Sequence, residues 1–432
     1  MNVLRHTEPG FQQRLRALSN ASSLFDPTIE ERACAIVEAV RTRGDKALLE
    51  FTKRFDGARL DIDQLAVSKA ELLDASLQAD ESLRSAIATA AKNIEFFSLK
   101  SLRRNWSARN AQGARVGEKF DPFDRVGIYV PGGAAPLVST CLMTLVLARV
   151  AGCREIVVCT PCGADGRVNP GILFAARVAG ATEIYKLGGA QAIAAMALGT
   201  ATLRPVQKVF GPGNAYVVAA KRLLFGRVAI DLLPGPSEVL VLADDSATPR
   251  FAAADLLAQA EHGSGHERVW LVTTSAKVLE AVRRECTRQL SKLSRRELIR
   301  RALANNGWLI QVKSLEEGIE LVNRLAPEHC EIMTQRSAKV AERITTAGAI
   351  FLGPWSPTVL GDYMAGPSHT LPTGGAGASF AGLTVDQFQR RTSVVEYSRA
   401  SLRKSAAALL KFAEIEGLDA HGRSALIRLG KR

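Results

Sequence analysis

Residues 126–133 (VGIYVPGG) decide how the middle of the chain folds, because a short apolar run leads directly into a glycine-rich turn. The run at 126–130 predicts a buried strand, and Pro131-Gly132-Gly133 predicts the turn that ends it. The apolar segment 140–151 then has the length of a helix. The order strand, turn, helix predicts the first part of a βαβ unit.

The same alternation continues along most of the chain. Further strands are predicted at 155–159, 183–187, 208–210 and 228–232, with helices at 168–179, 190–198 and after 214. A second set of strands is predicted at 239–242, 269–273, 309–312, 331–334 and 349–352. Strands that alternate with helices are typical of parallel sheets. The predicted fold class is therefore α/β, with two parallel-sheet domains and small helical segments at both ends.

These patterns divide the chain into four parts. Residues 1–25 are predicted to form a helical arm, with a helix at 10–18 that ends at Asn20-Ala21-Ser22-Ser23. Residues 26–125, mostly helical in pattern, are grouped with 239–380 as one discontinuous α/β domain, and 126–238 form the other. Residues 381–432 are predicted to form a helical tail that, like the arm, could be exchanged between two subunits.

Composition indicates a globular protein with ample core. The 432 residues are 47% hydrophobic and 23% charged, with a net charge of +13. The densest basic run, 283–301, has helical spacing without interleaved aromatic residues, so no nucleic-acid partner is expected. No apolar run reaches the roughly 18 residues of a membrane span, and the N-terminus lacks a signal core, so no membrane partner is expected.

Cysteine usage favours a reducing compartment. The seven cysteines are odd in number and scattered, which predicts free thiols and a cytoplasmic location. Cys159-Thr-Pro-Cys162 is a lone CxxC, and without a second pair it favours a structural role over a zinc or redox site.

Three glycine-rich turns follow predicted strands: PGGAAP, LGGAQA and GPGNAY. Such a turn exposes backbone N–H groups and a helix N-terminus to an anion, at the carboxyl ends of the strands where α/β sheets bind ligands. None of them is GxGxxG with an acid about 20 residues on, so the ordinary dinucleotide fingerprint is absent. Each turn alone is also compatible with a plain tight turn.

A candidate metal site lies at residues 256–266 (LLAQAEHGSGH). Gln259 and His262 stand three apart on one helical face and could offer an oxygen and a nitrogen to a divalent metal. Gly263 and Gly265 would stop the helix there. A solvated helix end with a capping histidine is the alternative.

Other histidines and carboxylates occur beside glycine or proline. Glu328 and His329 follow Pro327 where a helix meets a strand, and an imidazole and a carboxylate together can provide general-base chemistry. A helix-end charge pair is the alternative. Asp362 and His369 lie in one loop, where Asp362 could complete a metal shell, and His421 lies far away in sequence.

Long motifs in the same order resemble the histidinol dehydrogenase family over about residues 26–425: VGIYVPGG, GGAQAIAAM, GPGNAYVVAAKR, GPSEVLVLAD, QAEHG, RLAPEH, GDYMAGPSHTLPTGG and EGLDAH. The resemblance implies a homodimer with one Zn²⁺ per subunit. It also implies that L-histidinol is oxidised to L-histidine through the aldehyde, by a four-electron reaction with two NAD. The NAD-binding domain, 126–238, would be an incomplete Rossmann-like unit, which agrees with the missing fingerprint.

The resemblance also implies site residues. The zinc ligands would be Gln259, His262, Asp362 and His421, the last from the partner subunit. Glu328 would activate water for aldehyde hydration, and His329 would take protons in both oxidations. Ser237, His369 and Glu416, together with the metal ligands and the Glu328–His329 pair, would contact the substrate. Tyr129, Gln191 and Asn214 would contact NAD.

The chain departs from the family pattern in places. Residues 134–140 (AAPLVST) replace an aromatic-Pro-Ser-Ser stretch, Leu233-Pro234 replaces a smaller pair, and His266 is an extra imidazole expected at the surface. No ligand and neither member of the Glu328–His329 pair is lost. One alternative is a paralogue that acts on another alcohol, such as a sulfonated diol, although His369 and Glu416 favour histidinol. The other is a non-catalytic binding protein on this scaffold.

Overall fold

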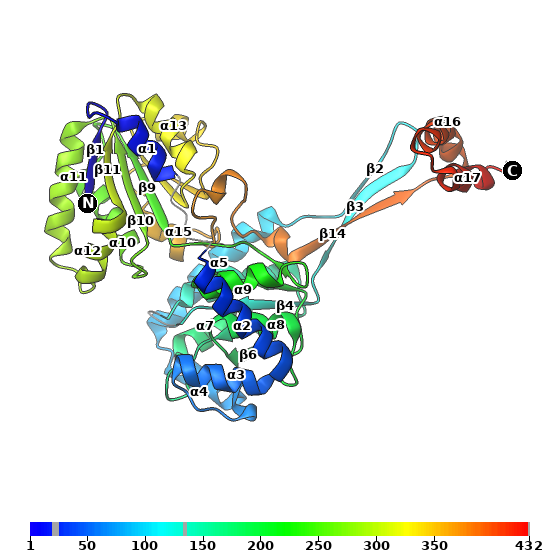
Figure 1. Cartoon of the computed structure of the whole chain (residues 1–432), viewed down its shortest axis with the longest axis horizontal. Helices are drawn as coiled ribbons and strands as arrows, with labels where there is room; N and C mark the ends of the chain where they lie inside the picture. The colour runs from blue at the N-terminus through cyan, green and yellow to red at the C-terminus, as the bar shows by residue number, and fades with distance from the viewer. Residues whose placement is uncertain (20–25, 133–135, 431–432) are drawn as a thin grey trace.

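The computed structural model describes residues 1–19, 26–132 and 136–430. It contains two α/β bodies, and a thin arm carries the C-terminus away from them (Figure 1). The predicted chain turn at residues 20–23 and half of the PGGAAP turn, residues 133–135, lie outside the described residues. The predicted α/β class with two parallel sheets is confirmed.

The first body contains a five-stranded parallel sheet in the order β6-β5-β4-β7-β8. Its strands are β4 (Arg125–Tyr129), β5 (Glu155–Thr160), β6 (Glu183–Lys186), β7 (Lys208–Phe210) and β8 (Ala229–Ile230). Its connecting helices are α6 (Val138–Ala151), α7 (Pro170–Ala179), α8 (Gly189–Leu198) and α9 (Ala215–Leu224). The chain starts at the central strand and builds outward on each side in turn, as in dinucleotide-binding sheets.

The second body contains a six-stranded parallel sheet in the order β1-β11-β10-β9-β12-β13. The strands are β1 (Asn2–Arg5), β9 (Glu238–Ala243), β10 (Arg268–Thr273), β11 (Gly307–Gln311), β12 (His329–Met333) and β13 (Ala349–Leu352). The helices are α10 (Pro249–Ala260), α11 (Ala276–Leu290), α12 (Arg296–Asn306), α13 (Leu315–Leu325), α14 (Ser337–Ala341) and α15 (Thr358–Tyr363). Strands β9 to β13 repeat the order of the first sheet.

The N-terminal arm differs from its prediction. Its helix, α1 (Phe11–Ser19), is present, but residues before it form β1, which pairs with β11 at the edge of the second sheet. Four residues are too few to show a strand pattern, and the partner lies about 300 residues away in sequence. The basic run at 283–301 is also split, because α11 ends at Leu290 and α12 begins at Arg296.

The helices of residues 27–101 belong with the first sheet, so their grouping with 239–380 is wrong. They are α2 (Pro27–Arg43), α3 (Asp45–Phe51), α4 (Lys69–Gln78) and α5 (Glu81–Ser101), with short turns η1 (Thr52–Asp56) and η2 (Ile62–Gln64). Helix α2 packs on α8 and α9, α4 on α7, and α5 on α6. The apolar faces of these helices, such as Ile36 and Val40, join the core of that body. Periodicity showed the apolar faces but not which sheet covers them.

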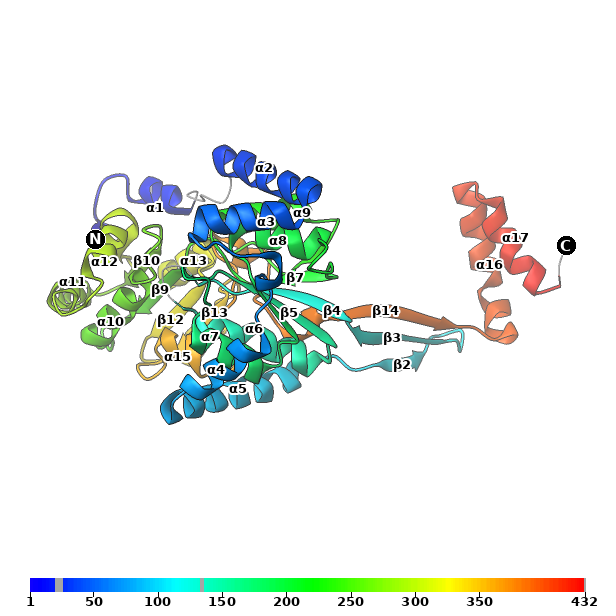
Figure 2. The same ribbon diagram turned by 90° about the horizontal axis from the view of Figure 1, so that it is seen from below.

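The arm is a three-stranded antiparallel ribbon that ends in two helices (Figures 1 and 2). It consists of β2 (Trp106–Arg109), β3 (Arg115–Pro122), β14 (Gln389–Glu396), α16 (Arg399–Glu416) and α17 (Asp419–Arg428), and β14 follows the turns η3 (Ala376–Ala378) and η4 (Val385–Phe388). The helical prediction for the C-terminal tail is therefore wrong at β14, and the mostly helical pattern of 26–125 did not predict β2 and β3. Strand β14 pairs with β3, more than 260 residues earlier, a contact that local patterns do not reveal.

Within the described residues, no helix is both long and apolar enough to cross a bilayer.

All seven cysteines are free thiols, and six of them are buried. Cys159 and Cys162 are among the buried ones, and burial raises the pKa of Cys162 to about 11, which agrees with the structural role predicted for the CxxC.

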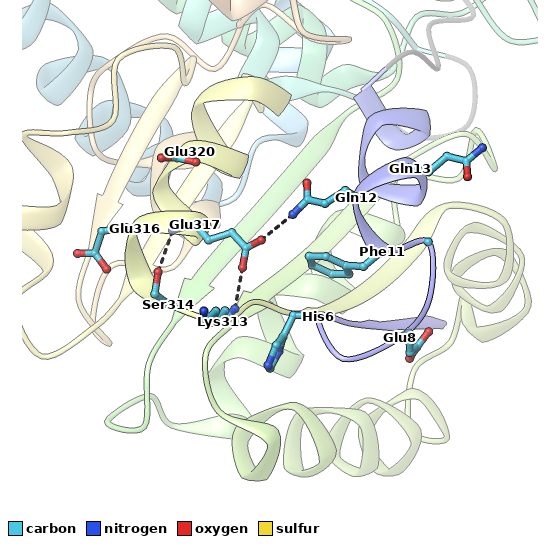
Figure 3. Close-up of a pocket in the computed structure, with 11 residues that line it drawn as sticks. His6, Glu8, Phe11, Gln12, Gln13, Lys313, Ser314, Glu316, Glu317 and Glu320 are labelled. Atoms are coloured by element: carbon cyan, nitrogen blue, oxygen red, sulfur yellow. Dashed lines mark hydrogen bonds between the residues drawn. The ribbon is translucent and has the colours of Figure 1, made fainter.

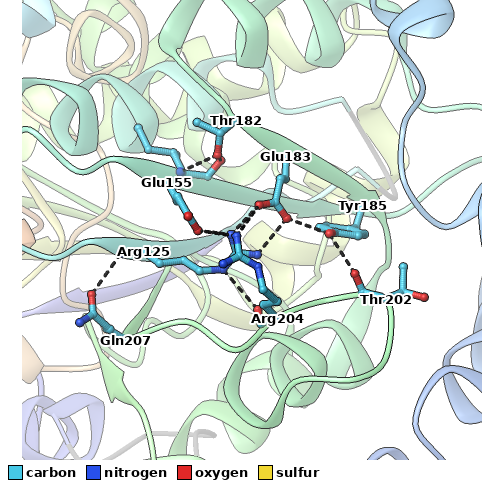
Figure 4. A network of polar contacts seen from close by, with 9 residues as sticks. Arg125, Glu155, Thr182, Glu183, Tyr185, Thr202, Arg204 and Gln207 are labelled. Carbon is cyan, nitrogen blue, oxygen red and sulfur yellow. Dashed lines mark hydrogen bonds and ion pairs between the residues drawn. The ribbon is translucent and has the colours of Figure 1, made fainter.

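A charge network joins the amino ends of three strands in the first sheet (Figure 4). Arg125 begins β4 and lies 2.5 Å from both Glu155 of β5 and Glu183 of β6, while Arg204 approaches Glu155 at 2.9 Å. The Arg125 guanidinium holds the pKa of Glu183 down at about 2. The network lies at the opposite edge of the sheet from the glycine-rich turns, so it stabilises the sheet without touching that edge.

Replacing Arg125 with methionine should lower the free energy of unfolding by about 2 kcal/mol at neutral pH, because two carboxylates then lose their shared cation. The depressed Glu183 pKa contributes stability above its usual value of 4.5 and loses it as the pH falls toward 2, so the difference from wild type should shrink in acid. Urea unfolding at several pH values measures both effects. Arg154→Met is the control, since Arg154 is 84% exposed; equal stability of the two variants would contradict the prediction.

Candidate active site

The chemistry-bearing residues of the second body gather at the amino ends of its strands, near the point where the strand order reverses between β9 and β12. Glu328 directly precedes β12 and His329 begins it, while Gln259 lies at the end of the helix that leads to β10 and His262 lies just past it. The carboxyl ends of the strands were the predicted location for ligands. In this sheet, the predicted catalytic and metal residues instead lie on the loops that enter the strands.

The backbone of Glu238, the first residue of β9, holds the Glu328–His329 pair in place. Its N–H donates to Glu328 Oε2 at 2.8 Å, and its carbonyl accepts a hydrogen bond from His329 Nδ1 at 2.9 Å. In the ladder between β9 and β12, His329 is paired with Val239, so Glu238 lies one residue before the first paired position of β9. Both side chains are about 95% buried.

Burial favours the neutral form of both side chains in this pair. Desolvation raises the pKa of Glu328 well above its usual value, and the neighbouring Glu238 and Asp362 carboxylates raise it further. Desolvation also lowers the pKa of His329, although the Asp362 charge acts in the opposite direction. A neutral imidazole whose Nδ1–H is donated to a carbonyl has a free lone pair on Nε2, as a general base requires.

The side chains of Gln259 and His262 have polar atoms that could bind a metal ion. The His262 Nδ1–H donates to the Gln259 carbonyl at 3.0 Å, which leaves His262 Nε2 as an acceptor. Gln259 is 3% exposed, and its Nε2 has no hydrogen-bond partner among the described residues. Helix α10 ends at Ala260, so His262 lies two residues past it and not on the predicted helical face. Gly263 and Gly265, with φ values of 92° and 78° in the left-handed region, turn the chain after His262. An oxygen and a nitrogen on this helix end suit a divalent metal.

Asp362 and His369 come to the same place from α15 and the loop after it. Asp362 Oδ1 lies 3.9 Å from His329 Nε2 and 4.0 Å from His369 Nδ1. His369 Nδ1 donates to the Asp362 carbonyl at 3.1 Å, and its Nε2 lies 3.2 Å from the Thr140 hydroxyl on α6. His369 therefore links this site to the first body. Thr140 is a contact residue that sequence reasoning did not single out.

Two of the predicted residues are not brought to this cluster. Glu416 and His421 are exposed and lie at the helical end of the arm, away from the two sheets (Figure 2). Among the described residues, no group of three histidine, cysteine, aspartate or glutamate side chains is placed to hold a metal. Gln259, His262 and Asp362 are nitrogen and oxygen donors that fit zinc, but they are fewer than the four ligands of a closed tetrahedral site.

Ser237 is brought to the site, whereas His266 is not. Ser237 precedes Glu238, and its hydroxyl hydrogen-bonds the buried Glu328 carboxyl group. His266 is exposed, as predicted, and the next residue, Glu267, accepts N–H bonds from Ser264 and Gly265 that close the turn. Glu238 was also missed as a site residue; its position at the end of the GPSE motif was the only signal in the sequence.

The predicted NAD contacts lie near the carboxyl edge of the first sheet. Tyr129 ends β4, and its hydroxyl accepts the Gly189 N–H at 3.1 Å. Gln191 is 1% exposed, and neither polar atom of its amide has a partner among the described residues. The Asn214 side-chain oxygen Oδ1 caps α9 by accepting from the backbone N–H groups of Tyr216 and Val217. Gly-rich turns and unpaired buried polar atoms at this edge fit an anionic ligand with many hydrogen-bonding groups.

A hollow of about 680 Å³ elsewhere contains none of the predicted site residues (Figure 3). It opens beyond the ends of β1 and β11, and Phe11, Gln12, Lys313 and Glu317 are among its lining residues. Glu317 accepts from Gln12 Nε2 at 2.9 Å and from the Lys313 N–H at 2.8 Å. The lining side chains thus pair with the chain itself.

Comparisons with known proteins agree over the whole chain. A family model described as histidinol dehydrogenase matches residues 20–429. A histidinol dehydrogenase of Heliobacterium mobile is 46% identical over 409 residues, which cover 95% of this chain and 96% of that protein. One of Xylella fastidiosa is 44% identical over 432 residues, covering 100% and 99%. The crystal structure of histidinol dehydrogenase from Elizabethkingia anophelis has a TM-score of 0.94 at 36% identity, covering 100% and 98% of the two chains.

Proposed function

The chain belongs to the histidinol dehydrogenase family and is a dehydrogenase, and from this premise we propose that it oxidises L-histidinol to L-histidine through the aldehyde. The complete reaction removes four electrons in two NAD-dependent oxidations. The observation that carries the proposal is the buried Glu328–His329 pair, held on the backbone of Glu238 beside Asp362.

His329 is the base of both oxidations. Its Nδ1–H is donated to the Glu238 carbonyl, and its lowered pKa keeps the ring neutral near pH 7. His329 Nε2 therefore accepts the hydroxyl proton of the alcohol in the first oxidation and that of the aldehyde hydrate in the second. NAD would accept one hydride in each oxidation.

Glu328 serves the hydration between the two oxidations. The aldehyde must add water before a second hydride can leave, and a carboxylate can take a proton from that water. Burial raises the pKa of Glu328, which makes its carboxylate a stronger base than an exposed one. The Glu238 N–H holds Glu328 Oε2, so the other oxygen is the one available to the water.

We assign one zinc ion per subunit to Gln259, His262, Asp362 and His421 of the partner subunit. The His262 ring, whose Nδ1–H is already donated and leaves Nε2 as an acceptor, the buried Gln259 amide and the nearby Asp362 carboxylate support this set. Bound zinc would hold the substrate's nitrogens and polarise the site as a Lewis acid. The substrate contacts in this proposal are completed by Ser237 and His369 of the same chain and by Glu416 of the partner subunit.

A homodimer with shared sites is the proposed assembly. The helices α16 and α17 expose Phe412, Ile415 and Ile427 at 65%, 70% and 61%, although large apolar side chains are normally covered. They carry Glu416 and His421 at the end of the arm, where the chain's own cluster is out of reach (Figure 1). Exchange of arms would cover these side chains and complete the ligand set.

The 126–238 domain is assigned to NAD. The free thiols support the cytoplasmic location predicted from sequence.

Purified zinc-loaded protein should produce two NADH per L-histidinol consumed, and a chelator should stop the reaction until zinc is restored. NADH absorbance against limiting substrate measures the ratio. One NADH per substrate would contradict the four-electron course. No turnover by folded, zinc-loaded protein would exclude histidinol and move the assignment to another alcohol, such as a sulfonated diol.

Substitution of Glu328 and substitution of His329 should slow different steps of the reaction. Glu328→Gln should slow oxidation of the aldehyde at least about tenfold more than oxidation of the alcohol, because only the former requires activated water. His329→Gln, at the adjacent position, should slow both by a factor of roughly 10² or more while zinc stays bound. Single-turnover NADH formation from each substrate separates the steps. Equal losses on both substrates in Glu328→Gln would exclude its role in hydration.

Shared sites predict complementation between two inactive variants. His262→Asn and His421→Asn should each lose zinc and activity as homodimers. Reassembly of equal amounts should restore roughly a quarter of wild-type activity, since half of the dimers are mixed and each of those has one intact site. Zinc content and activity are measured before and after mixing. If His421→Asn keeps its zinc, or if mixing restores nothing, the metal is not shared between subunits.

A further inference from the structure

A group of buried polar atoms at the carboxyl edge of the first sheet has no hydrogen-bond partner among the described residues. It consists of Thr160 Oγ1, both amide atoms of Gln191, and Asp56 Oδ2. Thr160 and Gln191 are 0% and 1% exposed. Buried polar groups are nearly always hydrogen-bonded, because leaving them unpaired destabilises the fold, so their accumulation at one edge points to a polar ligand.

Asp56 comes to this edge from outside the sheet. It ends the turn η1, after α3, and its two carboxylate oxygens lie 3.4 Å from the position that a Cβ on Gly188 would occupy. The same position is 2.9 Å from Pro161 Cβ. Pro161 follows β5, and Gly188 follows β6 by two residues, so Asp56 stands beside the ends of these two strands. Glycine at 188 leaves the space in front of the carboxylate open.

The position of Asp56 beside the end of β5 corresponds to a ribose-binding position in sheets with this strand order. In dinucleotide-binding sheets, an acid at the end of the second strand accepts the hydroxyl groups of the adenosine ribose. Here the second strand is β5, which ends at Thr160, and neither Thr160 nor the next residue, Pro161, supplies an acid. Asp56 brings a carboxylate to that place from a segment about 100 residues earlier in the chain.

We propose that Asp56 binds the adenosine ribose hydroxyls of NAD and selects NAD against its 2′-phosphorylated form. This inference rests on the proposed NAD-dependent function. A ribose hydroxyl would donate to the unpaired Oδ2, and a 2′-phosphate would place like charge against a partly buried carboxylate. Lys186, at the end of β6, cannot offset that charge freely, because it is buried and paired with Glu71 at 2.7 Å.

The pKa of the Asp56 carboxylate agrees with a group that lacks hydrogen-bond donors until a ligand binds. Burial raises the pKa of Asp56 to about 6, and its Oδ2 accepts no hydrogen bond from the part of the chain that the structure describes. The Asp56 charge also contributes to the raised pKa of Tyr129, after burial and against the Gly189 hydrogen bond. Asp56 is thus close to a residue already expected to contact NAD.

The test is binding of NAD⁺ and NADP⁺ to the full-length zinc-loaded protein without alcohol, by isothermal titration calorimetry. Wild type should prefer NAD⁺, and Asp56→Asn should reduce the NAD⁺/NADP⁺ affinity ratio by tenfold or more, on the order of one charge-assisted hydrogen bond plus the lost repulsion. Asp63→Asn, which removes the same charge from an exposed position seven residues on, should leave the ratio unchanged.

A second probe does not depend on the variant's stability. NAD⁺ that lacks the adenosine 2′-hydroxyl should bind wild type several-fold more weakly than NAD⁺, whereas Asp56→Asn should bind the two equally. A wild-type protein that binds NAD⁺ but shows no loss with the deoxy analogue, or an unchanged ratio in Asp56→Asn, would overturn the role of Asp56 alone. A wild-type protein that binds neither dinucleotide would overturn the NAD-dependent function itself.

Discussion

The catalytic pair depends on two backbone groups of one residue. At the start of β9, the N–H and C=O of Glu238 face β12 one step before the ladder begins, and Glu328 and His329 take them. This arrangement sets which Glu328 oxygen the backbone holds and which His329 nitrogen carries the proton. Because both are held by backbone in a central strand, their geometry is as rigid as the sheet, which is what a site that moves protons requires.

The two sheets have the same strand order but use opposite edges. The first sheet offers its carboxyl edge, where glycine-rich turns and unpaired buried atoms suit a dinucleotide, and its amino edge is closed by the Arg125 network. The second sheet offers its amino edge, where helix ends and strand starts supply Gln259, His262 and the catalytic pair. Contacts such as Thr140 with His369, and Met143 with Ser368, join the two bodies at the site. Cofactor and catalytic groups can therefore meet between the bodies.

The histidines of the site share one bonding pattern. His262, His329 and His369 each donate Nδ1–H to a backbone carbonyl and leave Nε2 for another role. In His369 that nitrogen lies beside the Thr140 hydroxyl, whereas in the proposed mechanism the Nε2 atoms of His262 and His329 bind the metal and accept a proton, respectively. The same device thus gives three imidazoles a defined tautomer, and the partner of Nε2 decides what each does.

Sequence alone determined the α/β class, most strands of both sheets, a helix end close to His262 and the Glu328–His329 pair at a helix-to-strand junction, because each is encoded by neighbours within about ten residues. It did not determine which sheet covers α2 to α5, the pairing of β1 with β11 or of β14 with β3, or the use of the amino edge by the second sheet. It also did not reveal Glu238, Thr140 or Asp56 as site residues. Those features depend on contacts between segments about 90 to 300 residues apart, whose local patterns are the same whichever partner they meet. Tertiary structure decided them, because only the folded chain brings such segments within hydrogen-bonding distance.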